Sequence, residues 1–171
     1  LIKVYVMNDS DALRDRVARE REWHDERFSD EDTRPSSGRF YAALKDWYKD
    51  YDNFCINSTS SRALEVGAGI ETLAINNELQ FELTSIDISS KAIDTLKLKK
   101  LSENVKFEVA DAHNLPYSNQ SFDFVLARGG LHHLDLDVAL CELNRVLGSP
   151  HKILFGEPLN GNLLIRLYRS L

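Results

Sequence analysis

Two glycines follow the first apolar run of the stretch RALEVGAGIETLAI, residues 62–75. Gly67 and Gly69 carry no side chain, so the backbone can bend tightly there and a ligand can approach the main chain. We expect a helix to begin near Glu71, and the free N–H groups of its first turn would face the same space. This pattern favours binding of a ligand with a negative or hydrogen-bond-accepting group.

An aspartate follows at a distance that suits a nucleoside. Asp87 ends the second apolar run, about 20 residues after Gly67, where an acidic side chain can accept both hydroxyls of a ribose. The alternative is an ordinary tight turn between a strand and a helix, with no ligand. Taken together, the two glycines and the aspartate favour a cofactor that contains adenosine.

Alternating apolar runs and amphipathic segments must position these residues. The expected strands are residues 63–67, 81–87, 105–110, 122–127 and 152–157, and the expected helices are residues 71–79, 90–100 and 135–147. Strands that alternate with helices need crossover connections, which build a parallel sheet with helices on both faces. The sequence therefore predicts an α/β, Rossmann-like, doubly wound sheet, in which ligands bind beyond the carboxyl ends of the strands.

The first sixty residues lack the alternation of apolar runs and amphipathic segments that the rest of the chain shows. Residues 11–28 and 39–54 are predicted helices, joined by a turn at residues 31–38, whereas residues 1–7 are either a short strand or no part of the fold. We expect residues 1–60 to form an N-terminal helical cap over the sheet edge and residues 61–171 to form the Rossmann-like domain. Because the last residues resemble the start of another helix, we expect the C-terminal strands of the fold to be missing from this sequence.

The composition limits the partners. The chain has 171 residues, 43% of them hydrophobic, and a net charge of -6, which argues against nucleic acid and favours a small molecule. Cys55 and Cys141 have no metal-ligand spacing, so neither a disulfide framework nor a zinc site is expected from the cysteines. No segment has the length of a membrane span and no signal peptide is recognisable. We therefore expect a cytoplasmic protein, of undetermined oligomeric state.

Five blocks of the sequence resemble, in order and spacing, the motifs of class I S-adenosylmethionine-dependent methyltransferases. They are ALEVGAGIETLAI, LTSIDIS, VKFEVADAHNLPY, SFDFVLARGGLHHL and ELNRVLGSPHKILFGEP. The resemblance covers roughly residues 62 to 158 and is greatest to the branch that methylates small molecules. It implies S-adenosyl-L-methionine as the cofactor and a small-molecule or lipid-like acceptor.

The resemblance also implies roles for single residues. A loop that holds the methionine moiety would consist of Glu65, Gly67, Ala68 and Gly69. Asp87 would bind the ribose, and Ile88 would lie beside the adenine.

The next two blocks complete the implied site. Asp111 and Ala112 would meet the adenine edge, where a carboxylate accepts from the exocyclic amine and a backbone N–H donates to a ring nitrogen. Arg128 and Gly129 would line the sulfonium end of the cofactor.

The sequence departs from the family pattern at two places. Glu71 stands where the family has a third glycine, and residues 147–153 replace a glycine-rich turn. These departures leave open a methyltransferase-like module that binds the cofactor without turnover. A nicotinamide-dependent oxidoreductase is a weaker alternative, because its third glycine would fall at Thr72.

Methyl transfer requires orientation, exclusion of water and, for a hydroxyl acceptor, a base. His132 is the candidate base, with His133 and His24 as weaker ones, although packing is the favoured explanation of the paired histidines. No metal is expected. Trp23, His24, Tyr41 and Tyr48 are candidates for closing over the cofactor, and the apolar residues among 163–168 for lining an acceptor pocket; core packing is the alternative for both groups.

Overall fold

The computed structural model describes residues 9–29, 45–57 and 61–157, and its centre is a sheet of five strands in which all neighbouring pairs are parallel. The strands are β1 (Arg62–Val66), β2 (Glu82–Asp87), β3 (Val105–Val109), β4 (Phe122–Arg128) and β5 (Leu147–Gly156). Their order is β3-β2-β1-β4-β5, so the order reverses between β1 and β4. The predicted Rossmann-like sheet is confirmed, and its ligand crevice should lie at the carboxyl ends of β1 and β4.

Helices cover both faces of this sheet, because the central strands β1 and β4 bury apolar side chains on both faces. On one face, Phe124 of β4 packs in a cluster with Tyr51 of α3 (Lys45–Ile56). On the other face, Val125, the next residue of β4, packs in a cluster with Leu143 of α5 (Leu136–Val146). Helix α4 (Ser90–Lys97) connects β2 to β3 and buries Ile93. The helices on both faces agree with the predicted doubly wound arrangement.

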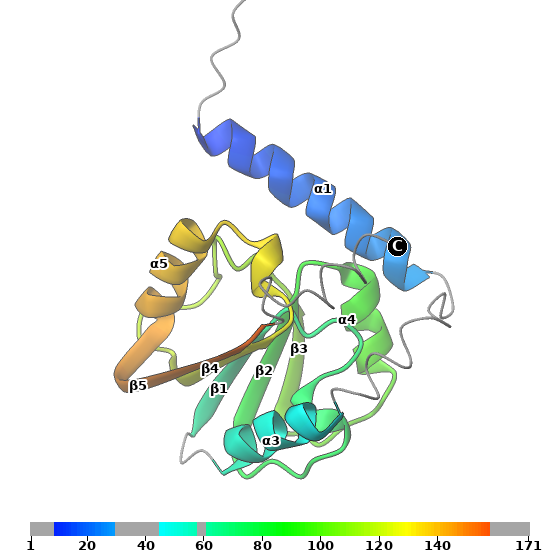
Figure 1. Cartoon of the computed structure of the whole chain (residues 1–171), viewed down its shortest axis with the longest axis vertical. Helices are drawn as coiled ribbons and strands as arrows, with labels where there is room; N and C mark the ends of the chain where they lie inside the picture. Colours follow the sequence, from blue (N-terminus) through cyan, green and yellow to red (C-terminus); the bar gives the residue numbers. More distant parts are fainter. Residues whose placement is uncertain (1–8, 30–44, 58–60, 158–171) are drawn as a thin grey trace, which may run out of the picture.

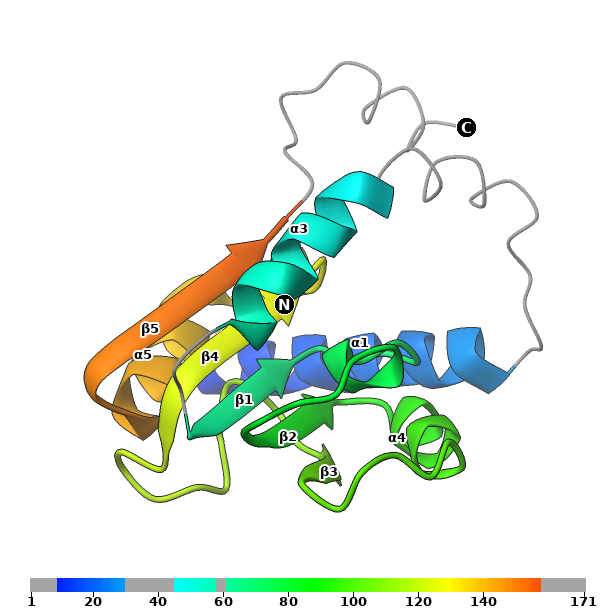
Figure 2. The same ribbon diagram turned by 90° about the horizontal axis from the view of Figure 1, so that it is seen from below.

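Helix α1 (Asp9–Ser29) lies across the carboxyl edge of the sheet and runs from beside α5 to beside α4 (Figures 1 and 2). Near its first half, Arg16 donates to the carbonyl oxygens of His133 and Leu134, at 3.3 and 3.0 Å. Near its last turn, Asp25 accepts a hydrogen bond from the Ser89 hydroxyl at 2.5 Å. The cap expected from the N-terminal segment is therefore formed by α1, which spans the rim where the ligand crevice was expected.

The loop after β1 differs from the prediction. The helix expected over residues 71–79 is wrong, since this segment contains only a single 3-10 turn, Leu73–Ile75. Both main-chain groups of Leu73 bond to side chains: its N–H donates to Glu65 at 3.0 Å, and its C=O accepts from Asn77 at 2.7 Å. Side-chain bonds of this kind compete with the α-helical ladder. The helix N-terminus that we expected to face the ligand is therefore not formed in this segment.

Two further predictions need correction. Helix α3, which overlaps the predicted helix 39–54 and extends to Ile56, packs against a face of the sheet and not over its edge, because Tyr51 and Cys55 are buried there. β5 begins at Leu147 and not at Lys152, and its pairing with β4 is interrupted between these two residues. The turn predicted around residues 149–151 thus occurs as an irregularity within β5, which contains the cis peptide Ser149–Pro150.

Several expectations concern segments outside the described residues: the possible strand at residues 1–7, the turn at 31–38, Tyr41 and the apolar residues among 163–168. Within the described ranges, no helix has both the length and the apolar character needed to cross a membrane.

Candidate functional site

The chain bends sharply after β1, as the two glycines predict. Gly67 has φ +70° and Gly69 has φ +56°, in the left-handed region that favours glycine. The N–H groups of Gly67 and Ala68 both donate to the carbonyl of Ile86 in β2, at 2.9 and 3.0 Å. A Cβ on Gly67 would lie 3.8 Å from the Cα of Gly130, so the ends of β1 and β4 approach closely. The bend thus lies at the point where the strand order reverses.

Glu65 lies beneath this loop and not beside the crevice. Its side chain is enclosed, with 4% of the residue exposed, and it accepts from the hydroxyls of Thr72 and Ser85 and from the N–H of Leu73. Burial raises the pKa of the Glu65 carboxyl, although the three hydrogen bonds act in the opposite direction. Its bonds are made within the loop and the sheet, so Glu65 holds the shape of the loop.

Asp87 ties the glycine loop to the start of α4. One carboxylate oxygen accepts from the N–H of Gly69 at 2.8 Å, and the other accepts from the N–H of Ser89 at 2.9 Å. The neighbouring Ile88 is half-buried. Only 6% of Asp87 is exposed, and Asp25 of α1 bonds to the hydroxyl of the nearby Ser89. The ring of Phe28 on this helix lies 3.5 Å from the position that a Cβ on Gly69 would take.

Asp111 follows β3 and forms a compact turn with a residue that the sequence reasoning missed. It accepts from both the backbone N–H and the ring Nδ1 of His113, at 2.9 and 2.6 Å. Burial raises the pKa of Asp111, but the bonds from His113 outweigh burial and hold this pKa below its usual value. Ala112, between them, is buried. The Nε2 atom of His113 accepts from the N–H of Asp135 at 2.9 Å, so this ring joins the end of β3 to the start of α5 as a neutral imidazole with its proton on Nδ1.

Arg128 is the last residue of β4 and Gly129 follows it, and the Arg128 side chain and the Gly129 main chain have different partners. The Arg128 guanidinium pairs with Asp52 of α3 at 3.0 Å and lies over the Tyr48 ring, 4.9 Å from its centre. Burial raises the pKa of Asp52 despite this pairing. Gly129 has φ +73°, and its N–H donates to the carbonyl of Gly156 at 2.7 Å. The side chain of Arg128 is therefore directed to the α3 face, and its main chain continues to the rim.

The two histidines after β4 have separate partners. His132, which is partly exposed, lies with Nδ1 3.0 Å from a carboxylate oxygen of Glu157, and the same carboxylate accepts from the N–H of Leu131 at 2.7 Å. Glu157 is a second residue that the sequence reasoning missed. The signal was available, because Glu157 ends the fifth predicted apolar run, residues 152–157, just as Asp87 ends the second.

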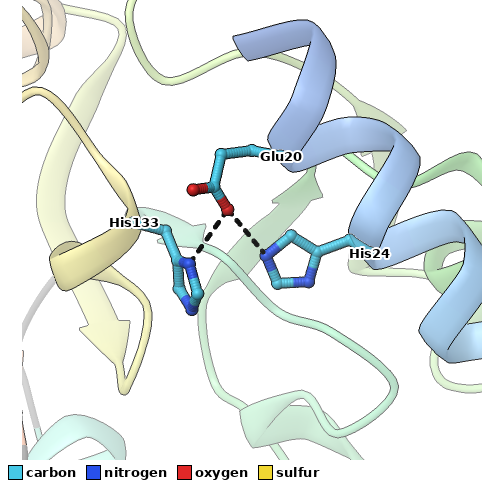
Figure 3. A group of neighbouring side chains, drawn as sticks. All are labelled: Glu20, His24 and His133. Carbon is cyan, nitrogen blue, oxygen red and sulfur yellow. Dashed lines mark hydrogen bonds and ion pairs between the residues drawn. The ribbon is translucent and has the colours of Figure 1, made fainter. Parts of the chain in front are cut away.

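His133 faces α1. Its Nδ1 atom lies 3.0 Å from Oε2 of Glu20, and Nε2 of His24 lies 3.8 Å from the same oxygen (Figure 3). Burial lowers the pKa of both His24 and His133. Trp23 and Phe28 add rings to this group, so the aromatic residues of α1 meet the β4 turn directly. No sequence signal links Glu20 to His133, because they come from segments more than a hundred residues apart.

The described residues thus place most of the predicted positions at one rim. The glycine loop and Asp87 are joined directly, and the turn with His132 and His133 meets the loop where Gly130 packs on Gly67. Asp111 lies at the end of the outer strand β3. Glu65 lies under the loop, whereas the Arg128 guanidinium pairs with Asp52 of α3 and also donates to the carbonyl of Glu71 in the loop after β1, at 3.4 Å.

A parallel sheet in this order, with a glycine bend after its first strand and acidic residues at the following strand ends, defines the class I S-adenosylmethionine-dependent methyltransferase fold. A family model described as a methyltransferase domain matches residues 64–154, more than half of the chain. The chain belongs to this methyltransferase family.

Solved structures share the fold. A SAM-dependent methyltransferase from Thermotoga maritima is 22% identical with a TM-score of 0.58, and the match covers 78% of this chain and 66% of that one. Phosphoethanolamine N-methyltransferase 2 of Haemonchus contortus, in complex with S-adenosyl-L-methionine, is also 22% identical with a TM-score of 0.58, covering 72% of this chain and 32% of that one.

Demethylmenaquinone methyltransferase of Staphylococcus aureus is similar in sequence. It is 41% identical over 93 residues, which are 51% of this chain and 39% of that protein. The chain therefore spans well under half the length of this curated relative.

Proposed function

We propose that this chain holds S-adenosyl-L-methionine and transfers its methyl group to a small-molecule or lipid-like acceptor. The observation that carries the proposal is the hydrogen bond from the Gly69 N–H to the Asp87 carboxylate, at 2.8 Å. This bond lies at the carboxyl rim of the sheet of a methyltransferase-family domain. Each oxygen of Asp87 accepts one backbone N–H, and a carboxylate oxygen has two lone pairs. Both oxygens therefore keep a position for a ribose hydroxyl.

The remaining contacts follow the strand ends. In this proposal Ile88 packs beside the adenine, and Asp111 and Ala112 meet its edge, since the bonds of Asp111 to His113 use only one of its two oxygens. The main chain of the glycine loop holds the methionine moiety, with Glu65 as a positioning residue below it. Gly129 continues the main chain of Arg128 to the sulfonium end.

When bound, the cofactor supplies an activated methyl group, whose bond to sulfur breaks as a bond to the acceptor's nucleophilic atom forms. The chain's own residues orient the two reactants and exclude water. With a hydroxyl acceptor, the proton goes to His132 in this proposal. The Glu157 carboxylate at 3.0 Å would stabilise the imidazolium that results, because a nearby negative charge favours the protonated form.

Helix α1 controls access in this proposal. Because only 6% of Asp87 is exposed, a ribose reaches it only after α1 shifts away from the rim. The name of the S. aureus relative supports a lipid-like acceptor, and it also favours a catalyst over a binding module without turnover. We further propose that the protein acts in the cytoplasm.

Calorimetric titration of the chain with S-adenosylmethionine and its demethylated product tests the proposal. We expect both to bind, and Asp87→Asn to weaken binding by about 10- to 100-fold, because it removes the charged acceptor of two ribose hydroxyls. The matched control is Asp94→Asn on the exposed face of α4. Failure of the unmodified chain to bind either compound would contradict cofactor binding, and equal affinities of the two variants would contradict the ribose contact of Asp87. Transfer of a labelled methyl group to quinone-like acceptors then distinguishes a catalyst from a module that only binds.

A further inference from the structure

Three potential metal ligands meet between α1 and the turn after β4. Oε2 of Glu20 lies 3.0 Å from Nδ1 of His133 and 3.8 Å from Nε2 of His24. The ligand atoms that the three residues offer all lie within 4.8 Å of one another. Figure 3 shows all three side chains converging on one point from two separate elements. Nothing in the proposed methyl transfer uses this group.

These distances are close to those that a small divalent ion requires. Zinc binds imidazole nitrogen and carboxylate oxygen at about 2.0 to 2.2 Å, so the edges of a tetrahedral ligand set are about 3.3 to 3.6 Å long. The two measured separations, 3.0 and 3.8 Å, lie on either side of this range. We infer that Glu20, His24 and His133 form a binding site for Zn²⁺ or a similar divalent transition metal, with the fourth position open to water.

The backbone presents the ligands in a fixed arrangement. Glu20 and His24 are four residues apart on α1, so they project from the same face of the helix. His133 lies in a short 3-10 turn in which its N–H donates to the carbonyl of Gly130 at 3.2 Å. Arg16 donates to the carbonyl of His133 and so holds this turn against α1 independently of the three ligands.

Packing also orients the two imidazoles. The rings of His24 and His133 lie 4.9 Å apart at 73°, and the Trp23 ring lies next to both of them. Phe28 stacks on the other side of His24, with ring centres 5.9 Å apart. A ligand whose rotamer is fixed by its neighbours loses little side-chain entropy when a metal binds.

The hydrogen bonding of His24 points to an additional partner. Its Nε2 atom, the nitrogen that would bind the metal, reaches Glu20 only at 3.8 Å, beyond hydrogen-bond distance. Buried polar groups in native proteins are normally satisfied, by protein atoms, by water or by an ion.

The location determines what the ion would do. A metal held by α1 and by the turn after β4 would fasten α1 across the carboxyl rim of the sheet. Metal binding then stabilises the closed arrangement of the cap. The site itself is independent of the proposed methyl transfer, and only its effect on cofactor access depends on that proposal.

Metal binding is tested on metal-stripped chain without an affinity tag and without cofactor. We expect one equivalent of Zn²⁺ to compete with a chromophoric chelator and to raise the thermal midpoint. We expect Co²⁺ in the same site to show the intense visible absorption of a tetrahedral complex, without the near-ultraviolet band of a thiolate ligand. Because cofactor is absent, failure here leaves the proposed function untouched.

Variants locate the site. Glu20→Gln and His133→Asn should each weaken Zn²⁺ binding by roughly tenfold or more, since even outer-shell changes have effects of that size. Two controls should bind as the unmodified chain does: Glu22→Gln, on an exposed part of the same helix, and Cys141→Ser, which removes the exposed thiol. Far-ultraviolet circular dichroism in chelator confirms folding of each variant. Absence of stoichiometric binding, unchanged binding in both ligand variants, or loss of binding in Cys141→Ser overturns the inference.

Discussion

Glu65 offers a direct test of how the glycine loop is held. The Glu65→Ala substitution removes the acceptor of the Leu73 N–H and of the Thr72 and Ser85 hydroxyls. The two hydroxyls lie 3.0 Å apart and can pair with each other, so the Leu73 N–H is the group left without a partner. An orphaned buried donor costs about 1–3 kcal/mol, and the vacated volume costs more, while the desolvation of the carboxylate is relieved. We expect a net loss of about 2–4 kcal/mol in the free energy of unfolding.

The Glu65→Gln substitution keeps the volume and most of the hydrogen bonds. The amide oxygen can accept from the Leu73 N–H, and the amide NH₂ can donate to the Thr72 and Ser85 oxygens once their hydroxyl hydrogens rotate. We therefore expect the free energy of unfolding to change by only about 1 kcal/mol at neutral pH.

The pH dependence of this pair has a definite sign. Burial raises the pKa of Glu65 in the folded state above the ordinary unfolded value of about 4.3. Its protonated form therefore stabilises the fold fully below that value, and this stabilisation is lost as the pH rises through the folded pKa. Glutamine does not titrate, so the free energy of unfolding of Glu65→Gln should improve relative to the unmodified chain as the pH increases from about 4.

Urea denaturation, followed by circular dichroism and tryptophan fluorescence at several pH values, measures these free energies. If Glu65→Gln proves as destabilising as Glu65→Ala, the network requires a charged acceptor and the hydroxyls do not reorient. If Glu65→Ala changes the free energy of unfolding by less than about 1 kcal/mol, the loop is not held by Glu65 at all.

Other residues give shorter tests. His113→Ala leaves the Asp135 N–H and the Asp111 carboxylate without their ring partner and should cost about 2–3 kcal/mol in urea denaturation, whereas a loss under about 0.5 kcal/mol would show that water replaces the ring. Gly129→Ala should cost about 1–2 kcal/mol by the same assay from backbone strain at φ +73°, since nothing lies within 4 Å of the new Cβ. Phe28→Ala should speed association of the demethylated cofactor in stopped-flow fluorescence; an unchanged rate would argue against α1 as the barrier to entry. The bond from Arg145 lowers the pKa of Glu142, so this pair stabilises the fold above the unfolded pKa and the effect is lost as the pH falls through the folded pKa. In urea denaturation, the free energy of unfolding of Glu142→Gln should therefore fall less steeply than that of the unmodified chain as the pH decreases.

The sequence predicts those features that depend on local pattern. The strands and the bend at Gly67 follow from runs of apolar residues and from glycine's access to positive φ, and both are observed. The helix expected over residues 71–79 fails because Glu65, from the strand before it, bonds to the backbone of Leu73. A contact between separate segments overrides local propensity in this case.

Other features depend on tertiary placement. An amphipathic pattern says that a helix has a buried side, but it does not say which surface covers that side, so α3 was expected at the sheet edge and lies on a face instead. The group of Glu20, His24 and His133 combines a helix near the start of the chain with a turn after the fourth strand. No spacing rule within one element could have revealed it.

The contrast between α1 and the other helices supports the proposal that α1 is the element that opens. No residue among 10–29 is buried, whereas α3, α4 and α5 each bury apolar side chains against the sheet. The contacts that α1 makes are chiefly polar or lie at ring edges, as with Asp25 and Ser89 or Glu20 and His133. Polar contacts near the surface exchange for water at little net cost, while removing a buried helix exposes apolar area at about 25 cal/mol per Å². Entry to Asp87 by displacement of α1 therefore requires much less free energy than entry through the sheet layers, and a ligand that adds bonds between α1 and the rim shifts this balance toward the closed form.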